Sequence, residues 1–201
     1  MSDIFWNDVY LAKSADERSW TQEWPFDVEV IERLVPEHDA AIIDVGAGAS
    51  DLLVALVARG FTDLTALDIS AVALDEARRR VGPLAPVTWI VSDVTTFDAE
   101  RSYALWRDRA TFHFLTESSQ QRRYLNVIRR AIQPDGYFLL ATFAPDGPST
   151  CSGLPVQRWS TQEMVDFVDD DFHLVHEQPL LHVTPWGSEQ SFNSWVFQRR
   201  P

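Results

Sequence analysis

The sequence has little of what marks secreted or membrane-spanning proteins. Its 201 residues include one cysteine, Cys151, so no disulfide can form within the chain. So few cysteines are typical of a reducing compartment. No apolar stretch approaches the roughly 20 residues of a membrane-spanning helix, and the first ten residues lack the basic and apolar regions of a signal peptide. We therefore expect a cytoplasmic protein with no membrane partner.

Positive charge is also scarce, with 17 Lys and Arg against 30 Asp and Glu and a formal net charge of −13. Such a field repels phosphate backbones, which argues against nucleic acid as a partner. No metal is expected either, since the nearby pair His173 and His176 would point to opposite faces of a strand. The length and the 45% hydrophobic content are typical of one globular domain.

Tryptophan is abundant, and three of the eight, Trp6, Trp20 and Trp24, fall within the first 24 residues. Rings with such large apolar faces must pack against other parts of the protein. We expect residues 1–36 to form an aromatic N-terminal segment that covers a main domain of residues 37–201. A simple structural cap is one interpretation of this segment.

Apolar runs and helical spacing alternate along the rest of the chain. The patterns predict strands at 40–45, 64–68, 87–91, 103–106, 137–143, 172–177 and 192–198, and helices at 26–36, 51–59, 71–82, 118–132 and 160–168. Alternating strands and helices form parallel sheets, whereas the last two strands, joined without a helical pattern, should be antiparallel. We expect an α/β fold: a Rossmann-like, seven-stranded, mostly parallel sheet with an antiparallel terminal strand and helices on both faces.

The first predicted strand runs into a glycine loop, "DVGAGAS". Gly46 and Gly48 allow a tight turn and a close approach of the backbone to a ligand, and the helix that follows attracts an anionic group. A dinucleotide is disfavoured, because the third position of its fingerprint is Asp51 rather than glycine or alanine. A carboxylate there would repel a pyrophosphate.

Three acids end three successive predicted strands, so they should meet at one rim of the sheet. Asp68 is placed to accept the hydroxyls of a ribose. Asp93, backed by Val94, could bind an adenine amino group, and Asp44 suits an ammonium group. Each acid alone could be a turn residue or a helix cap, but together they indicate a nucleoside site.

These segments resemble the class I S-adenosylmethionine-dependent methyltransferases. The resemblance is carried in order by "DVGAGAS", "LDIS", "SDV", "LWRDRATFHFL" and "PDGYFLLATF". It implies S-adenosylmethionine as the cofactor, S-adenosylhomocysteine as its product, and a seventh strand that is antiparallel. This cofactor carries no phosphate, so Asp51 is tolerable beside the loop. The residues that we expect at the cofactor are Trp6, Tyr10, Trp20, Trp24, Asp44, Gly46, Ala47, Gly48, Asp68, Ile69, Asp93, Val94 and Arg107.

Methyl transfer is an in-line displacement, so the protein mainly aligns the reactants and excludes water. A base matters only if the acceptor arrives protonated. We therefore expect the N-terminal segment to act as a lid, with Tyr10 able to bind the cofactor carboxylate. The segment also resembles the N-terminal part of several small methyltransferases, including enzymes that methylate thiols and halides.

The segment after the fourth strand should face the transferred methyl group. Asp108 is the candidate for orienting the site, and His113 is either a base or a core histidine. Arg109 either pairs with Asp108 or binds a carboxylate of the acceptor. Further acceptor contacts should come from the loops 144–155 and 182–190, where Cys151 is expected to be a small side chain rather than a nucleophile.

Three functions remain open from the sequence. The first is a methyltransferase acting on an N, S or O nucleophile of a small molecule, since an aromatic lid suits a closed pocket. The second is a protein-lysine N-methyltransferase, because "RDRATF" and the chain size resemble a group that modifies elongation factors and citrate synthase. The third is a protein that binds S-adenosylmethionine without turnover.

Overall fold

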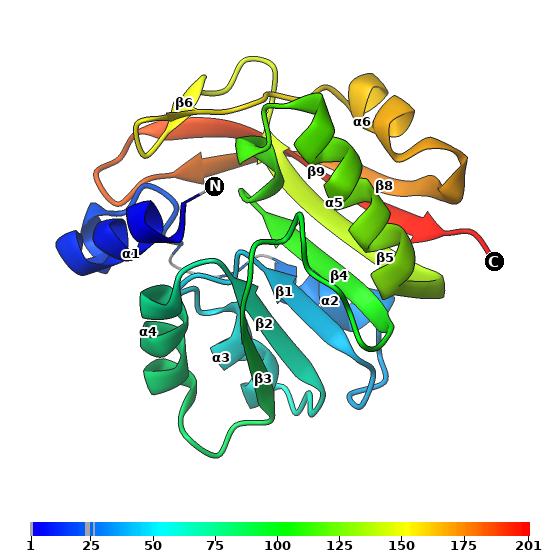
Figure 1. The fold of residues 1–201 in the computed structure, drawn as a ribbon, viewed down its shortest axis with the longest axis horizontal. Coiled ribbons are helices and arrows are strands. Elements are labelled where there is room, and N and C mark those ends of the chain that lie inside the picture. Colours follow the sequence, from blue (N-terminus) through cyan, green and yellow to red (C-terminus); the bar gives the residue numbers. More distant parts are fainter. Residues whose placement is uncertain (1, 23–24, 26) are drawn as a thin grey trace.

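A seven-stranded sheet forms the centre of the molecule (Figure 1). The computed structural model describes residues 2–22, 25 and 27–201. In spatial order the strands are β3 (Val87–Val91), β2 (Leu64–Asp68), β1 (Ile42–Val45), β4 (Tyr103–Arg109), β5 (Ile132–Phe143), β9 (Glu189–Arg199) and β8 (Phe172–Val183).

Strands β1 to β5 are parallel, and β9 is antiparallel both to β5 and to β8. The strand order reverses at β1, whose neighbours are β2 and β4. Every residue of β1 and β2 is buried, because helices cover both faces of this part of the sheet. The predicted fold class is confirmed.

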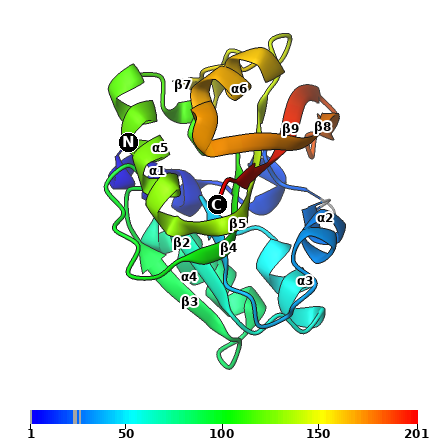
Figure 2. The same ribbon diagram turned by 90° about the vertical axis from the view of Figure 1, so that its right-hand side faces the viewer.

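Helices α2 (Asp27–Leu34), α3 (Leu52–Ala58) and α4 (Ala71–Val81) cover one face, and α5 (Ser118–Ala131) and α6 (Thr161–Val168) cover the other. Figure 2 shows α3 and α5 on opposite sides of the strands. The predicted caps are present: the Ser70 hydroxyl accepts from the Ala73 amide (3.1 Å), and Ser160 and Glu163 form a capping box. Short 3₁₀ turns span Ala15–Glu17, Phe112–Phe114 and Asp169–Asp171.

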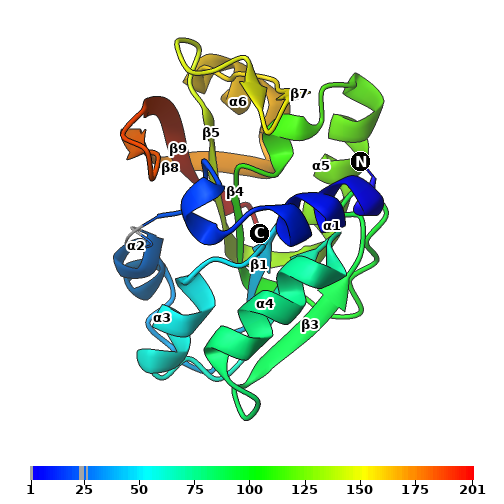
Figure 3. The same cartoon turned by 90° about the vertical axis from the view of Figure 1, so that its left-hand side faces the viewer.

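The aromatic N-terminal segment contains a helix that the sequence patterns did not predict, α1 (Asp3–Ala12). It buries Trp6 and Tyr10, four residues apart, whereas its Ile4 and Leu11 are exposed. It lies against α4 and in front of the ends of the central strands, as Figure 3 shows. Of the helices in the described ranges, none is long and apolar enough to cross a membrane.

Several strand boundaries differ from the predictions, including that of β4, which runs to Arg109 rather than to residue 106. The loop after β5 carries a small hairpin, β6 (Thr150–Cys151) and β7 (Leu154–Pro155), turned by Ser152 and Gly153, which both have positive φ. Strands β8 and β9 extend well beyond the predicted ends because they pair with each other out to Val183 and Glu189. Strand β5 begins at Ile132, so the Pro-Asp-Gly turn is an irregularity within it.

Candidate functional site

A deep cavity opens at the carboxyl ends of β1, β2 and β4, at the point where the strand order reverses. Its volume is about 1310 Å³, including open solvent at the mouth. The lining residues come from the N-terminal segment (6–22 and 25), the glycine loop (45–52), the ends of β2 and β3 (67–69 and 92–94), the end of β4 with its following turn (107–115), Arg80 and Cys151.

The two loop glycines are required by their backbone and by their neighbours. Gly46 and Gly48 have φ of +61° and +54°, which side-chain-bearing residues rarely adopt. A Cβ on Gly46 would lie 1.6 Å from the Thr111 hydroxyl oxygen, and one on Gly48 would lie 2.4 Å from the Tyr10 hydroxyl oxygen. The bare loop therefore allows α1 and the turn after β4 to close directly onto it.

Asp68 supports this loop from the end of β2. Its carboxylate accepts hydrogen bonds from the amides of Gly48 and Ser70, each at 2.8 Å. Burial raises the pKa of Asp68 to about 6 against the opposing effect of these two bonds. Asp68 lines the cavity, and its carboxyl group changes from charged to neutral as the pH falls through about 6.

The next strand supplies a second acid. The Asp93 carboxylate accepts from the amide and hydroxyl of Thr95, at 2.8 and 2.7 Å. Asp93 lines the cavity together with the apolar side chains of Val94 and Ile69. The predicted nucleoside residues of β2 and β3 are thus brought together.

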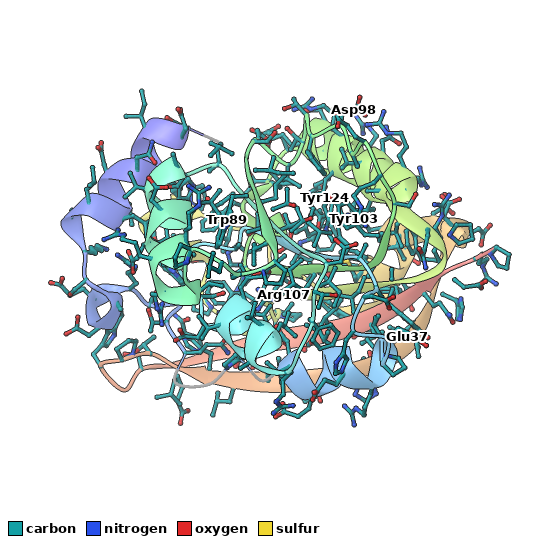
Figure 4. The ribbon with its side chains drawn as sticks, turned by 90° about the horizontal axis from the view of Figure 1, so that it is seen from below. Glu37, Trp89, Asp98, Tyr103, Arg107 and Tyr124 are labelled. Atoms are coloured by element: carbon teal, nitrogen blue, oxygen red, sulfur yellow. The ribbon has the colours of Figure 1, made fainter. Side chains whose placement is uncertain are left out.

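Asp44 lies elsewhere than expected. It is fully buried and absent from the cavity wall, and it accepts a hydrogen bond from Arg107 Nη1 at 2.8 Å. The same guanidinium binds Asp27 of α2 at 2.6 and 2.8 Å. Burial lowers the pKa of Arg107, but the two carboxylates outweigh it, and the net direction is upward. Arg107 lies deep in the molecule (Figure 4), and it rather than Asp44 reaches the cavity.

Asp108 points to the opposite face of β4 from Arg107. One carboxylate oxygen accepts from the amides of Thr111 (3.0 Å) and Phe112 (3.2 Å), and the other accepts from the Tyr124 hydroxyl (2.8 Å). Burial raises its pKa to about 6. Asp108 does not line the cavity, so it can orient the site only by holding the turn after β4.

His113 is buried away from the cavity wall. Its ring packs against Phe114 and Phe143, with centroids 4.5 and 4.8 Å away, and neither ring nitrogen has a hydrogen-bond partner in the described part of the chain. Burial, reinforced by the charge of Arg109, lowers its pKa to about 3. This placement argues against the predicted base role and favours a core histidine.

Rings of the N-terminal segment form the roof of the cavity. Trp6 contacts Trp20 and Phe114 edge to face, at 5.9 and 5.1 Å, and Tyr10 contacts Trp20 at 5.9 Å. Burial raises the pKa of Tyr10, so its hydroxyl stays protonated. Trp24, also expected at the cofactor, lies outside the described residues.

The roof is fixed by contacts that the sequence did not indicate. Arg18 forms an ion pair with Glu76 of α4 at 2.8 Å and lies 4.5 Å over the Tyr10 ring. The ring of His182, from β8, hydrogen-bonds the carbonyl of Ser19 at 2.5 Å. Arg18, a single arginine among aromatic residues, was the only sign of these contacts in the sequence. Its partner Glu76 is 58 residues away, so spacing alone could not identify it.

Arg109 lines the cavity and does not pair with Asp108. Its Nη1 donates to the Trp20 carbonyl at 3.1 Å, and its guanidinium lies 5.2 Å over the Phe192 ring. Cys151 lines the same end of the cavity, where burial raises the pKa of its thiol. This end is therefore apolar, with one cation in it.

The chain is similar to known methyltransferases. A family model described as a methyltransferase domain matches residues 42–136. The EEF1A lysine methyltransferase 2 of Mus musculus is 24% identical over 213 residues, which cover 97% of this chain and 82% of that protein. Its counterpart in Danio rerio is 25% identical, and the match covers 71% of this chain and only 58% of that relative's length.

Two solved structures have the same fold. The structure described as conversion of a disulfide bond into a thioacetal group during echinomycin biosynthesis has a TM-score of 0.77 at 18% identity, covering 100% of this chain and 92% of that one. The N-methyltransferase NodS of Bradyrhizobium japonicum WM9, in complex with S-adenosylhomocysteine, has a TM-score of 0.74 at 15% identity, covering both chains fully. The domain match over residues 42–136 and the shared fold make this chain similar to the class I S-adenosylmethionine-dependent methyltransferases.

Proposed function

We propose that this protein transfers the methyl group of S-adenosylmethionine to an N, S or O nucleophile of a small molecule, within the cavity described above. One observation carries the proposal. A single cavity runs from the nucleoside acids at β2 and β3 to an apolar compartment at Arg109 and Cys151, under a roof of aromatic rings. Donor and acceptor can therefore meet in one cavity.

The residues present fit the donor. Asp68 offers a charged acceptor for ribose hydroxyls, and Asp93, with Val94 beside it, suits an adenine ring. Gly46 and Gly48 line the cavity, so the loop backbone can lie close to the donor. When bound, S-adenosylmethionine supplies an activated methyl carbon on a sulfonium. The described acids give this positively charged donor a favourable environment.

The task of the chain is alignment and exclusion of water. Orientation alone can contribute about 7–11 kcal/mol in favourable cases. Asp108 fixes the turn after β4 through two backbone amides, and the rings of Trp6 and Trp20 cover the cavity. We propose that residues 1–36 act as the lid over the main domain of residues 37–201. His113 plays no part in this proposal.

A protein lysine is the second candidate acceptor. The similarity to EEF1A lysine methyltransferase 2 of mouse and zebrafish favours it. One feature of the cavity weighs against it: Arg109 would repel an ammonium group at the acceptor end. We therefore rank the small-molecule acceptor first.

The test is transfer of a labelled methyl group. Purified protein is incubated with S-adenosylmethionine labelled on the methyl carbon and with two halves of one cell lysate, one deproteinised and one freed of small molecules. We expect label in the small-molecule half. Label confined to protein would reverse the ranking, and binding of S-adenosylhomocysteine without any transfer would indicate a binding protein.

A further inference from the structure

Four arginines line the cavity, and they differ in how their charge is balanced. Arg18 pairs with Glu76, Arg107 with Asp27 and Asp44, and Arg80 with Asp51. Arg109 has no carboxylate partner among the described residues. Among the described residues, its guanidinium donates one hydrogen bond, to the Trp20 carbonyl, although a guanidinium carries five N–H donors.

This unpaired cation is costly where it lies. Arg109 is half-buried and surrounded by apolar groups, with Phe192, Trp20 and Phe114 nearby. Burial lowers its pKa to about 10, so it remains charged at neutral pH. A buried charge without a partner is disfavoured in proteins. An anion bound in the cavity would supply the missing partner.

The position of Arg109 assigns this anion to the acceptor rather than to the donor. In the strand register Asp108 lies level with Val45, so Arg109 follows at the level of Gly46. Its guanidinium, however, extends to Phe192 on β9, two strands away from β4 and away from β1. The nucleoside acids Asp68 and Asp93 lie in the opposite direction, at the ends of β2 and β3.

We propose that Arg109 binds a carboxylate of the methyl acceptor, so that the acceptor is an organic acid with an apolar or aromatic body. The inference rests on the proposed function, because it assumes that the donor occupies the end of the cavity at Asp68. Guanidinium and carboxylate match in geometry, since both can form two parallel hydrogen bonds. The aromatic rings beside Arg109 would pack on the acceptor's body.

Binding tests the proposal without knowledge of the natural acceptor. The probes are 2-naphthoate and its neutral amide, 2-naphthamide, titrated by calorimetry into the protein saturated with S-adenosylhomocysteine. We expect the carboxylate to bind about tenfold or more tightly than the amide, as charge-assisted hydrogen bonds allow. R109Q should abolish this preference, and R109K should retain part of it. R123Q, which changes an exposed arginine of α5, should behave as the wild type.

A second titration separates the donor from the acceptor. R109Q and the wild type are compared for S-adenosylhomocysteine affinity, which should agree within about threefold. If R109Q loses donor affinity to the same extent as naphthoate affinity, the arginine binds the donor carboxylate and the proposal is wrong. Equal binding of naphthoate and naphthamide by the wild type would also overturn it. Absence of S-adenosylhomocysteine binding would instead refute the proposed function.

Discussion

The hydroxyl of Tyr10 in α1 closes onto Gly48 in the loop after β1, so closely that a Cβ on Gly48 would lie 2.4 Å from the hydroxyl oxygen. The roof and the floor of the cavity are therefore fitted to each other at this point. The Arg18 guanidinium lies 4.5 Å over the Tyr10 ring and forms an ion pair with Glu76 of α4. A substitution at Gly48 should therefore displace Tyr10 in the roof as well as the loop itself.

We expect G48A to weaken S-adenosylhomocysteine binding by about tenfold or more, and to lower the free energy of unfolding by more than the roughly 1–2 kcal/mol that a left-handed alanine costs. The matched control is G153A, whose φ is also positive but whose Cβ would meet nothing within 4 Å. Calorimetry and urea unfolding check both variants. Y10F should restore part of the loss in G48A, and a double variant no better than G48A would contradict the clash with Tyr10.

The charge of Asp68 should make donor binding dependent on pH. Because burial raises its pKa to about 6, the free carboxyl becomes neutral as the pH falls through 6. A neutral carboxyl is the poorer acceptor for ribose hydroxyls, so affinity should fall with falling pH, by up to about tenfold per unit, and level off above pH 7. S-adenosylhomocysteine titrations between pH 5 and 8 measure this.

The control is D108N, because Asp108 has a similarly raised pKa but lies off the cavity. D108N should keep the pH dependence of donor binding. D68N should bind the donor weakly at every pH, with no pH dependence. A pH dependence that survives in D68N would show that another group titrates.

Arg107 should be the most sensitive charged residue of the core. In R107L the carboxylates of Asp27 and Asp44, 1% and 0% exposed, would be left buried together without a cation. We expect a loss of about 3–5 kcal/mol in the free energy of unfolding, as for other broken buried pairs. The loss should be smaller at lower pH, where protonation neutralises Asp44, whose pKa is raised by burial. Urea unfolding at pH 6 and 8 measures both effects.

Two variants show whether burial is the cause. D27N leaves Arg107 and Asp44 as a one-to-one pair, so it should cost clearly less than R107L. R101L removes an arginine that pairs with Asp63 at the surface, and it should cost less than about 1 kcal/mol. Similar losses in R107L and R101L would contradict the importance of the buried network.

His113 should be replaceable. H113F keeps an aromatic ring between Phe114 and Phe143 and removes two ring nitrogens that have no described partner. We expect kcat within about threefold of the wild type and equal or greater stability, since unpartnered buried polar atoms are unfavourable. Steady-state kinetics with the acceptor found by the labelling experiment checks this. A loss of a hundredfold or more with unchanged donor binding would restore the base role.

The patterns of the chain predicted most of the fold because each depends on near neighbours in the sequence. Alternation of strand and helix gave the parallel sheet, and Ser70 and Ser160 marked true helix starts. The small hairpin at Cys151 escaped prediction because its strands have two residues each. The helix at Asp3–Ala12 escaped because it buries only two of its residues, too few for a clear period.

By itself the sequence determined the order of elements, the glycine loop and the acids that end β2 and β3, since local spacing and strand ends specify them. The tertiary structure decided which charged groups face the cavity. Arg107 pairs with Asp27, 80 residues away in the sequence, and also with Asp44. Asp44 is therefore part of a buried charge network in the core and does not line the cavity. Arg109, two residues further along the same strand, has no carboxylate partner in the described part of the chain and lines the cavity. Charge pairing depends on distance in space, which sequence spacing does not report.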